Sequence, residues 1–220
     1  MVAHAEELIY TKFNALDTTA LGDVPARMAA ARIWLVPTLS TFHGIVSQWG
    51  RPPAADSALK LSDAAFFSPD LQRYWTQANP YTGRTADGAT WALRAFHFQY
   101  PLVRALHNAG VRFMTGTDTP LPVMIPGASV HLELAQLRAA GLSNFDVLAA
   151  ATRNPGDFLN QLIDRDLKVG RVAPGFVADV LLVRGNPLAD LSVLRAPVAV
   201  FTRGRYLDPN KLTELRAHAR

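Results

Sequence analysis

The feature that most constrains the fold is the tripeptide Gly116-Thr117-Asp118, which directly follows the mainly apolar run Val111–Met114. A short strand that ends in Gly and then Asp places a carboxylate on a rigid rim. The carboxyl ends of strands are where an α/β barrel carries its catalytic residues. We therefore expect an α/β fold with Asp118 at a strand end, although an Asp that only caps the following loop remains an alternative.

The segments around this tripeptide predict alternating helices and strands. The apolar run Ile33–Val36 is closed by Pro37 and is typical of a strand buried on both faces. A helix that begins near Pro25 precedes it. Further helices are predicted over 91–108, 129–140, 144–152 and from Asn154 onward, each bounded by a Gly, a cap or a Pro.

Residues 42–90 interrupt this pattern. Proline and glycine break the periodicity repeatedly, so we expect an elaborated loop at the mouth of the barrel. It is rich in aromatic residues, which argues against disorder. A substrate lid or wall and an aromatic plug or oligomer contact are equally good interpretations of this insert. Its aromatic residues include Trp49, Phe66, Phe67, Tyr74, Trp75 and Tyr81.

After Leu167 the pattern changes to alternation with short turns, which predicts strands over 169–172, 178–183 and 198–201. We expect a small β unit here, so the chain divides into a barrel part, residues 1–166, and a β part, residues 167–220.

Composition excludes several classes of function. The net charge is +4, but the basic residues are scattered and densest in the C-terminal tail, so no nucleic-acid surface is expected. There is no cysteine, which excludes disulfides, thiolate metal sites and a cysteine nucleophile. No signal peptide or membrane-spanning run is visible, so we expect no membrane partner and, by default, a cytoplasmic location.

Histidines supply the other candidate ligands. His4 is followed by Glu6 and Glu7, which could orient its imidazole. His43 follows the second predicted strand, and His131 lies on the helix after Asp118. A lone histidine also occurs in purely structural roles, and the spacing of these residues does not by itself establish a metal site.

Taken in order, the segments resemble the amidohydrolase superfamily, in its imidazolonepropionase-like and dipeptidase-like branch. The residues that carry the resemblance are Ala3–Glu7, Leu35–Leu39, Ala109–Phe113 with Gly116–Asp118, Pro126-Gly127 with His131–Leu134, Ala140–Ser143, Ala149–Pro155, Gly170–Asp179 and Asn186–Leu188.

The resemblance implies the C-terminal part of a (β/α)8 TIM-like barrel and part of a small β-sandwich. It implies hydrolysis of amide or cyclic amide C–N bonds by a water that one or two divalent metals, usually zinc, activate. Asp118 matches the final-strand Asp, a metal ligand and general acid/base, and His4 resembles the sixth-strand His, a metal ligand. His131 and His43 are expected near a small-molecule or dipeptide-like substrate.

The metal ligands that the family carries in its first strands have no counterpart in this sequence. We therefore expect an incomplete C-terminal portion that is inactive alone, with a missing N-terminal half or a homo-oligomer completing it. The alternative is a non-catalytic remnant that serves as an interaction or scaffold subunit.

Overall fold

The computed structural model describes residues 1–61, 64, 67–163 and 166–218. The chain forms two compact units, Met1–Gly141 and Leu142–Arg220. The boundary between these units follows Gly141, whereas the sequence predicted a boundary after residue 166. The boundary between functional domains stays a prediction.

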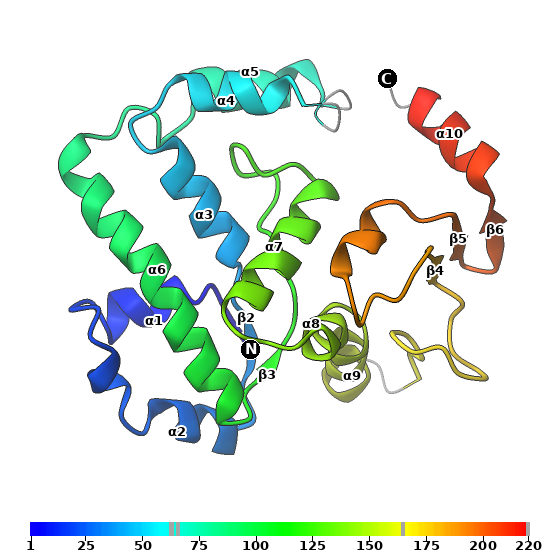
Figure 1. The fold of residues 1–220 in the computed structure, drawn as a ribbon, viewed down its shortest axis with the longest axis horizontal. Helices are drawn as coiled ribbons and strands as arrows, with labels where there is room; N and C mark the ends of the chain where they lie inside the picture. Colours follow the sequence, from blue (N-terminus) through cyan, green and yellow to red (C-terminus); the bar gives the residue numbers. More distant parts are fainter. Residues whose placement is uncertain (62–63, 65–66, 164–165, 219–220) are drawn as a thin grey trace. The chain divides into compact units, whose positions relative to one another are not determined.

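The first unit contains a parallel sheet in the order β1-β2-β3, made of β1 (Val2–Ala3), β2 (Trp34–Val36) and β3 (Arg112–Phe113) (Figure 1). Ala3 pairs with Val36, and Leu35 pairs with Phe113. Helix α1 (Glu6–Thr11), the 3-10 turn η1 (Thr18–Leu21) and helix α2 (Val24–Ala30) connect β1 to β2. The predicted order of strand, helix and strand is confirmed, although β3 is shorter than expected.

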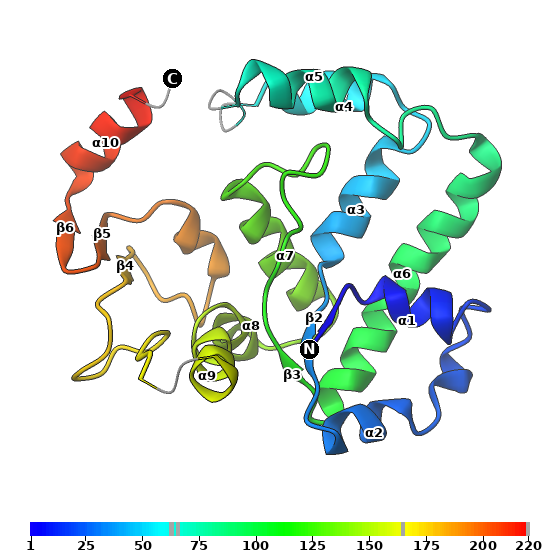
Figure 2. The ribbon, with the colours of Figure 1, turned by 180° about the vertical axis from the view of Figure 1, so that it is seen from behind.

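Helix α6 (Ala86–Asn108) leads into β3 and begins earlier than the predicted residue 91. One face of α6 is buried through residues such as Ala95, Leu102 and Leu106. Helices α1 and α2 pack against α6, as Figure 2 shows from behind. Helix α7 (Ala128–Ala139) follows the loop after β3 and ends before Gly141, whose φ of 107° suits glycine.

The expectation of an irregular insert over 42–90 is wrong. The structure forms α3 (Leu39–Gln48), α4 (Pro53–Leu59) and α5 (Pro69–Gln77) in and around this segment (Figure 1). Ser68 caps α5 through Leu71 N, and Pro69 occupies its first turn, which is a regular helix start.

The insert has a small hydrophobic core, in which fully buried Trp75 packs with Ala55 and Ala64. Ile125, from the loop after Asp118, completes this core. The Trp75 indole also donates to the Pro120 carbonyl at 3.0 Å. The insert therefore packs on the loop that follows Asp118. Phe66 lies outside the described residues.

The second unit begins with α8 (Asn144–Ala151), where Ser143 and Asp146 form the predicted capping box, and α9 (Arg153–Leu162). An antiparallel sheet of β4 (Val180–Leu182), β5 (Ala199–Thr202) and β6 (Arg205–Leu207) follows. A 3-10 turn, η3 (Leu191–Arg195), joins β4 to β5, and the chain continues into α10 (Pro209–His218).

One expectation for this unit needs correction. Residues 169–172 form no strand, because Gly170 takes a φ of 83° and the Val169 carbonyl lies close against Gly156 of α9. Arg171 pairs with Asp157 of the same helix at 2.7 Å. The basic tail forms α10, and most of its described residues are exposed.

Among the helices that the structure describes, none combines the length and the apolar character needed to cross a bilayer.

Candidate functional site

The carboxyl ends of the three parallel strands deliver His4, Thr38 and Asp118. His4 directly follows β1, Thr38 follows β2 after Pro37, and Asp118 lies in the loop between β3 and α7. Because parallel strands share one direction, these residues lie at the same edge of the sheet. With about 4.8 Å between neighbouring strands, the ends of β1 and β3 are roughly 10 Å apart.

All three residues adopt left-handed backbone conformations, with φ of 66° at His4, 51° at Thr38 and 50° at Asp118. Such conformations are uncommon for residues with a side chain, and they cluster where a site must be held in a fixed geometry. The main chain holds them, since His4 N donates to the Val36 carbonyl at 2.8 Å and Ala5 N donates to the Pro37 carbonyl at 3.0 Å.

The imidazole of His4 is oriented by Thr38. Its Nδ1 lies 2.8 Å from the Thr38 hydroxyl and 3.8 Å from a carboxylate oxygen of Glu6. Within the part of the chain that the structure describes, Nε2 of His4 has no hydrogen-bond partner. The second nitrogen is therefore available to a ligand, as it is in a metal-binding histidine with an oriented ring.

Glu6 is a buried carboxyl beside this histidine. Burial, followed by the neighbouring charges of Glu7, Asp118 and Glu133, raises the pKa of Glu6 to about 7, although a main-chain hydrogen bond partly opposes the shift. Its Oε2 has no partner among the described residues. The charge of Asp118, which follows the outer strand β3, thus raises the pKa of Glu6, which follows the other outer strand β1.

Asp118 is exposed in the loop between β3 and α7. The loop is fixed because the Thr41 hydroxyl donates to the Thr117 carbonyl at 2.9 Å. Gly116 is needed for packing, since a Cβ there would stand 2.4 Å from Cγ1 of Val36. The carboxylate is therefore presented to solvent by a backbone that packing and hydrogen bonds hold in place.

Two tyrosines, Tyr10 of α1 and Tyr81 of the insert, interact electrostatically with Glu6. Burial, then the charges of Glu6 and Glu7, raises the pKa of Tyr10 to about 12. Burial also raises the pKa of Tyr81, with Tyr74 and Asp118 contributing in the same direction. Tyr81 belongs to the insert, so this segment contributes a polar aromatic group near the carboxyl groups of Asp118 and Glu6.

Glu133 of α7 is completely buried and lies against the start of α3. Its Oε2 accepts a hydrogen bond from Ser40 N at 2.7 Å. Burial raises the pKa of Glu133 to about 7, while hydrogen bonds from the start of α3 favour the ionised form. Its other oxygen has no partner among the described residues.

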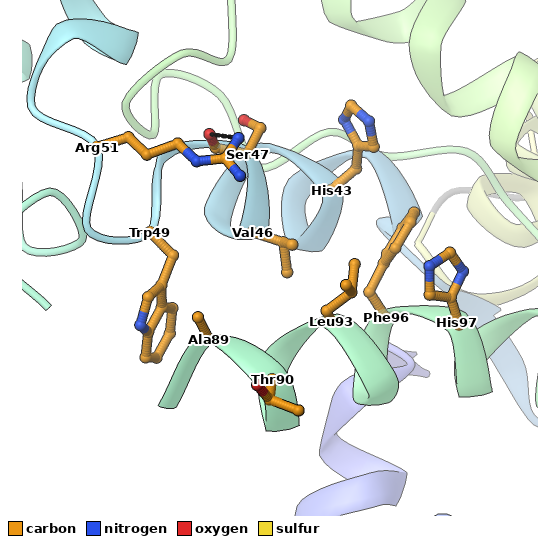
Figure 3. A pocket seen from close by; sticks show the side chains of 10 residues that line it. All are labelled: His43, Val46, Ser47, Trp49, Arg51, Ala89, Thr90, Leu93, Phe96 and His97. Carbon is orange, nitrogen blue, oxygen red and sulfur yellow. Dashed lines mark hydrogen bonds between the residues drawn. The ribbon is translucent and has the colours of Figure 1, made fainter. Parts of the chain in front are cut away.

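The two remaining candidates occupy other positions. His131 is partly buried in α7, two residues before Glu133. His43 lines a pocket of about 500 Å³ between α3 and α6, together with Trp49, Phe96 and His97 (Figure 3). Burial lowers the pKa of His43. Since His4 and Asp118 do not line this pocket, their relation to a substrate at His43 stays a prediction.

The described residues contain donors suited to a divalent cation, but not a complete set. Nε2 of His4 and the Asp118 carboxylate are of the types that bind zinc. No group of three or more His, Cys, Asp or Glu side chains is placed to hold a metal in the described ranges. A catalytic zinc takes three protein ligands, so these side chains form at most part of a site.

Sequence reasoning missed the role of Thr38 and undervalued Glu133. The available signal for Glu133 was a carboxyl next to the apolar positions Leu134 and Leu137 of a helix that must bury one face. Thr38 carried only the signal of a polar residue directly after a buried strand and a proline.

Comparison with known proteins places this chain in a family. The Amidohydrolase family profile matches residues 87–207, which is more than half of the chain. A bottromycin amidohydrolase superposes with a TM-score of 0.62 at 26% identity, over 88% of this chain and 41% of that chain. A search of curated proteins found no match.

Two further solved structures share the fold. A Xaa-Pro dipeptidase with methionine bound in its active site has a TM-score of 0.54 at 20% identity, covering 87% of this chain and 38% of that chain. The ochratoxinase of A. niger has a TM-score of 0.54 at 20% identity, covering 88% and 36%. The chain thus spans about two fifths of the length of these structures.

A parallel sheet with polar residues at its carboxyl edge, helical connections and these neighbours fits part of a TIM barrel. The chain belongs to the amidohydrolase family.

Proposed function

We propose that this chain contributes to a metal-dependent hydrolase of amide or cyclic amide C–N bonds. The observation that carries the proposal is the shared sheet edge at which His4 and Asp118 stand, both in left-handed conformations. Membership of the amidohydrolase family supports the reaction class.

In this proposal, Nε2 of His4 and the Asp118 carboxylate supply two ligands of one or two divalent ions, most simply zinc. A divalent cation polarises a carbonyl group and lowers the pKa of water, which makes hydroxide available near neutral pH. The remaining ligands come from protein outside this chain or from a second copy of it. For that reason we expect the chain alone to have little or no hydrolase activity.

Asp118 would also transfer the proton from the attacking water to the leaving nitrogen. Its carboxylate is exposed at a strand end, so it can take a proton from the attacking water and deliver it to the leaving nitrogen. Glu6, close to His4 and buried, limits the approach of solvent to the imidazole from its own side.

The substrate would be a small molecule or a dipeptide-like compound. A neighbouring structure is a Xaa-Pro dipeptidase, which fits the dipeptidase-like branch expected from the sequence. We place His131 and, less directly, His43 near the substrate. Tyr81 and the insert would form one wall of the pocket, because the charges of Asp118 and Glu6 act on this tyrosine.

We also propose that β4, β5 and β6 belong to a small β-sandwich, to which this chain contributes one sheet. A purely structural remnant acting as a scaffold subunit is not favoured by the comparisons, since the family and its solved neighbours are hydrolases.

The test is a titration of the purified chain with Zn²⁺ and with Co²⁺, whose visible spectrum reports on coordination by nitrogen and oxygen. We expect weak binding that His4→Ala and Asp118→Asn each reduce at least tenfold. His97→Gln, an exposed histidine of α6, should leave the affinity unchanged. Equal affinity in the wild type, H4A and D118N would refute the proposed ligands.

Hydrolysis is measured on the same samples with Xaa-Pro dipeptides and cyclic amides as substrates. The chain alone should give rates near the uncatalysed background. Efficient zinc-dependent hydrolysis by a discrete oligomer, abolished by H4A, would retain the reaction class and overturn the expectation of inactivity.

A further inference from the structure

The start of α3 lacks the capping bond that its sequence leads one to expect. Thr38 is the N-cap residue, and threonine at this position ordinarily accepts a hydrogen bond from the helix main chain. Here Thr38 has a left-handed conformation and its side chain makes no capping bond. Its hydroxyl instead donates to the Pro37 carbonyl at 2.8 Å and contacts Nδ1 of His4 at 2.8 Å.

These two contacts fix the proton on the imidazole. A hydroxyl has one hydrogen, and a carbonyl oxygen can only accept, so the Thr38 hydrogen is directed to Pro37. Toward His4, the hydroxyl oxygen can therefore only accept, and Nδ1 must carry hydrogen. Glu6 Oε1, 3.8 Å from the same nitrogen, favours the same arrangement. Nε2 is then the nitrogen with the free electron pair.

The missing cap is replaced from a distant helix. Ser40 N, in the first turn of α3, donates at 2.7 Å to Glu133 of α7, which is 93 positions away in sequence. Glu133 is 0% exposed, so water cannot provide this bond. A buried main-chain N–H that lacks a partner is strongly unfavourable. Without Glu133, Ser40 N would need another acceptor, and an N-cap threonine hydroxyl is a group that commonly supplies this bond.

We propose that Glu133 is a positioning residue: it caps α3 in place of Thr38 and so leaves the Thr38 hydroxyl to hold His4 with its proton on Nδ1 and its electron pair on Nε2. The value of this arrangement for metal binding rests on the proposed function. The tautomer and its dependence on Thr38 and Glu133 do not.

The experiment is ¹⁵N NMR of the metal-free chain with ¹⁵N-labelled histidine, at alkaline pH where histidine side chains are neutral. The chain has six histidines, and the spectrum of H4A assigns the signals of His4. In the wild type we expect a protonated Nδ1 and an unprotonated Nε2. A wild-type signal with the proton on Nε2 would overturn the inference.

Thr38→Val removes the acceptor, and we expect the ratio of Nδ1–H to Nε2–H to fall about fivefold, which corresponds to one neutral hydrogen bond. Thr38→Ser keeps the hydroxyl and should restore the wild-type ratio. An unchanged ratio in T38V would show that Thr38 does not set the tautomer.

Glu133 is tested by a pair of variants. Glu133→Leu removes the acceptor for Ser40 N and should shift the His4 ratio in the direction of T38V. Glu133→Gln keeps an acceptor oxygen in a side chain of the same shape and should resemble the wild type, even if E133L folds poorly. Asp87→Asn, an exposed carboxylate in the first turn of α6, is the control for charge.

The results separate the two proposals. If E133Q shifts the ratio as strongly as T38V, or if a folded E133L leaves it unchanged, the positioning role is wrong. A wild-type tautomer as expected, combined with no loss of Zn²⁺ affinity in H4A, would refute the proposed function and leave the positioning role intact.

Discussion

The hydroxyl of Thr41 in α3 donates a hydrogen bond of 2.9 Å to the main-chain carbonyl of Thr117, the residue before Asp118. Thr41 is only 2% exposed, so this bond is protected from water. Helix α3 thus has two hydrogen bonds to distant parts of the first unit. Its first turn is capped by Glu133, and its third residue fixes the loop that presents Asp118.

Replacing Thr41 with Val should destabilise this loop. The substitution keeps the shape of the side chain but removes the donor to the carbonyl of half-buried Thr117, which costs about 0.5–1.5 kcal/mol. We expect a lower urea midpoint and faster amide exchange at Leu121, whose N–H donates to the Asp118 carbonyl. Thr76→Val removes an exposed hydroxyl bond within α5 and is the matched control. Equal urea midpoints for T41V and T76V would contradict the assigned role of Thr41.

The buried carboxyl of Glu133 should make stability depend on pH. Its pKa is raised from 4.5 to about 7, mainly by burial, so the folded state holds a proton that the unfolded state releases. The stabilisation that this retained proton gives to the folded state is fully present below pH 4.5 and is lost as the pH rises toward 7. Linkage gives a loss on the order of 3 kcal/mol in the free energy of unfolding over this range.

Glu133→Gln removes the titrating group and keeps the acceptor for Ser40 N. Urea unfolding from pH 4.5 to 7 should therefore show a flatter dependence in E133Q than in the wild type. Glu6 shifts in the same direction and will leave part of the slope in both proteins. Two parallel curves would mean that Glu133 does not have the raised pKa.

Local patterns were enough to place the strand ends but not the contacts between them. The apolar run before Gly116 predicted a strand, which is β3 although it ends at Phe113, and Ser143 with Asp146 predicted a capping box. Both signals lie within a few residues. The bond from His4 to Thr38 spans 34 positions, and that from Ser40 to Glu133 spans 93. Such partners depend on how helices pack, which no short-range periodicity encodes.

The two errors in secondary structure have different origins. Alternation over residues 169–172 predicted a strand, yet Gly170 takes a φ of 83° and the Val169 carbonyl lies close against Gly156 of α9. In the insert, the proline residues predict breaks, whereas Pro53 and Pro69 begin helices. The start signal at Ser68 was present in the sequence.

Trp75 should be the main stabilising residue of the insert. It is 0% exposed in the cluster with Ala55 and Ile125, and its indole reaches the Pro120 carbonyl at 3.0 Å. Trp75→Ala should reduce the free energy of unfolding by about 3–5 kcal/mol, as is usual for a buried large aromatic. Trp91→Ala, which truncates an exposed tryptophan of α6, should cost much less. Similar losses in the two variants would argue against a packed core in the insert.

Gly116 tests whether the Asp118 loop depends on close packing rather than on glycine's backbone freedom. A Cβ at Gly116 would lie 2.4 Å from Cγ1 of Val36, so Gly116→Ala should destabilise the protein by about 1–3 kcal/mol through overpacking. The control is Gly83→Ala, where a Cβ would have no neighbour within 4 Å. The double variant G116A/V36A removes the obstructing methyl group and should recover part of the loss. If V36A does not rescue G116A, the requirement at Gly116 lies in the backbone of the loop and not in its contact with β2.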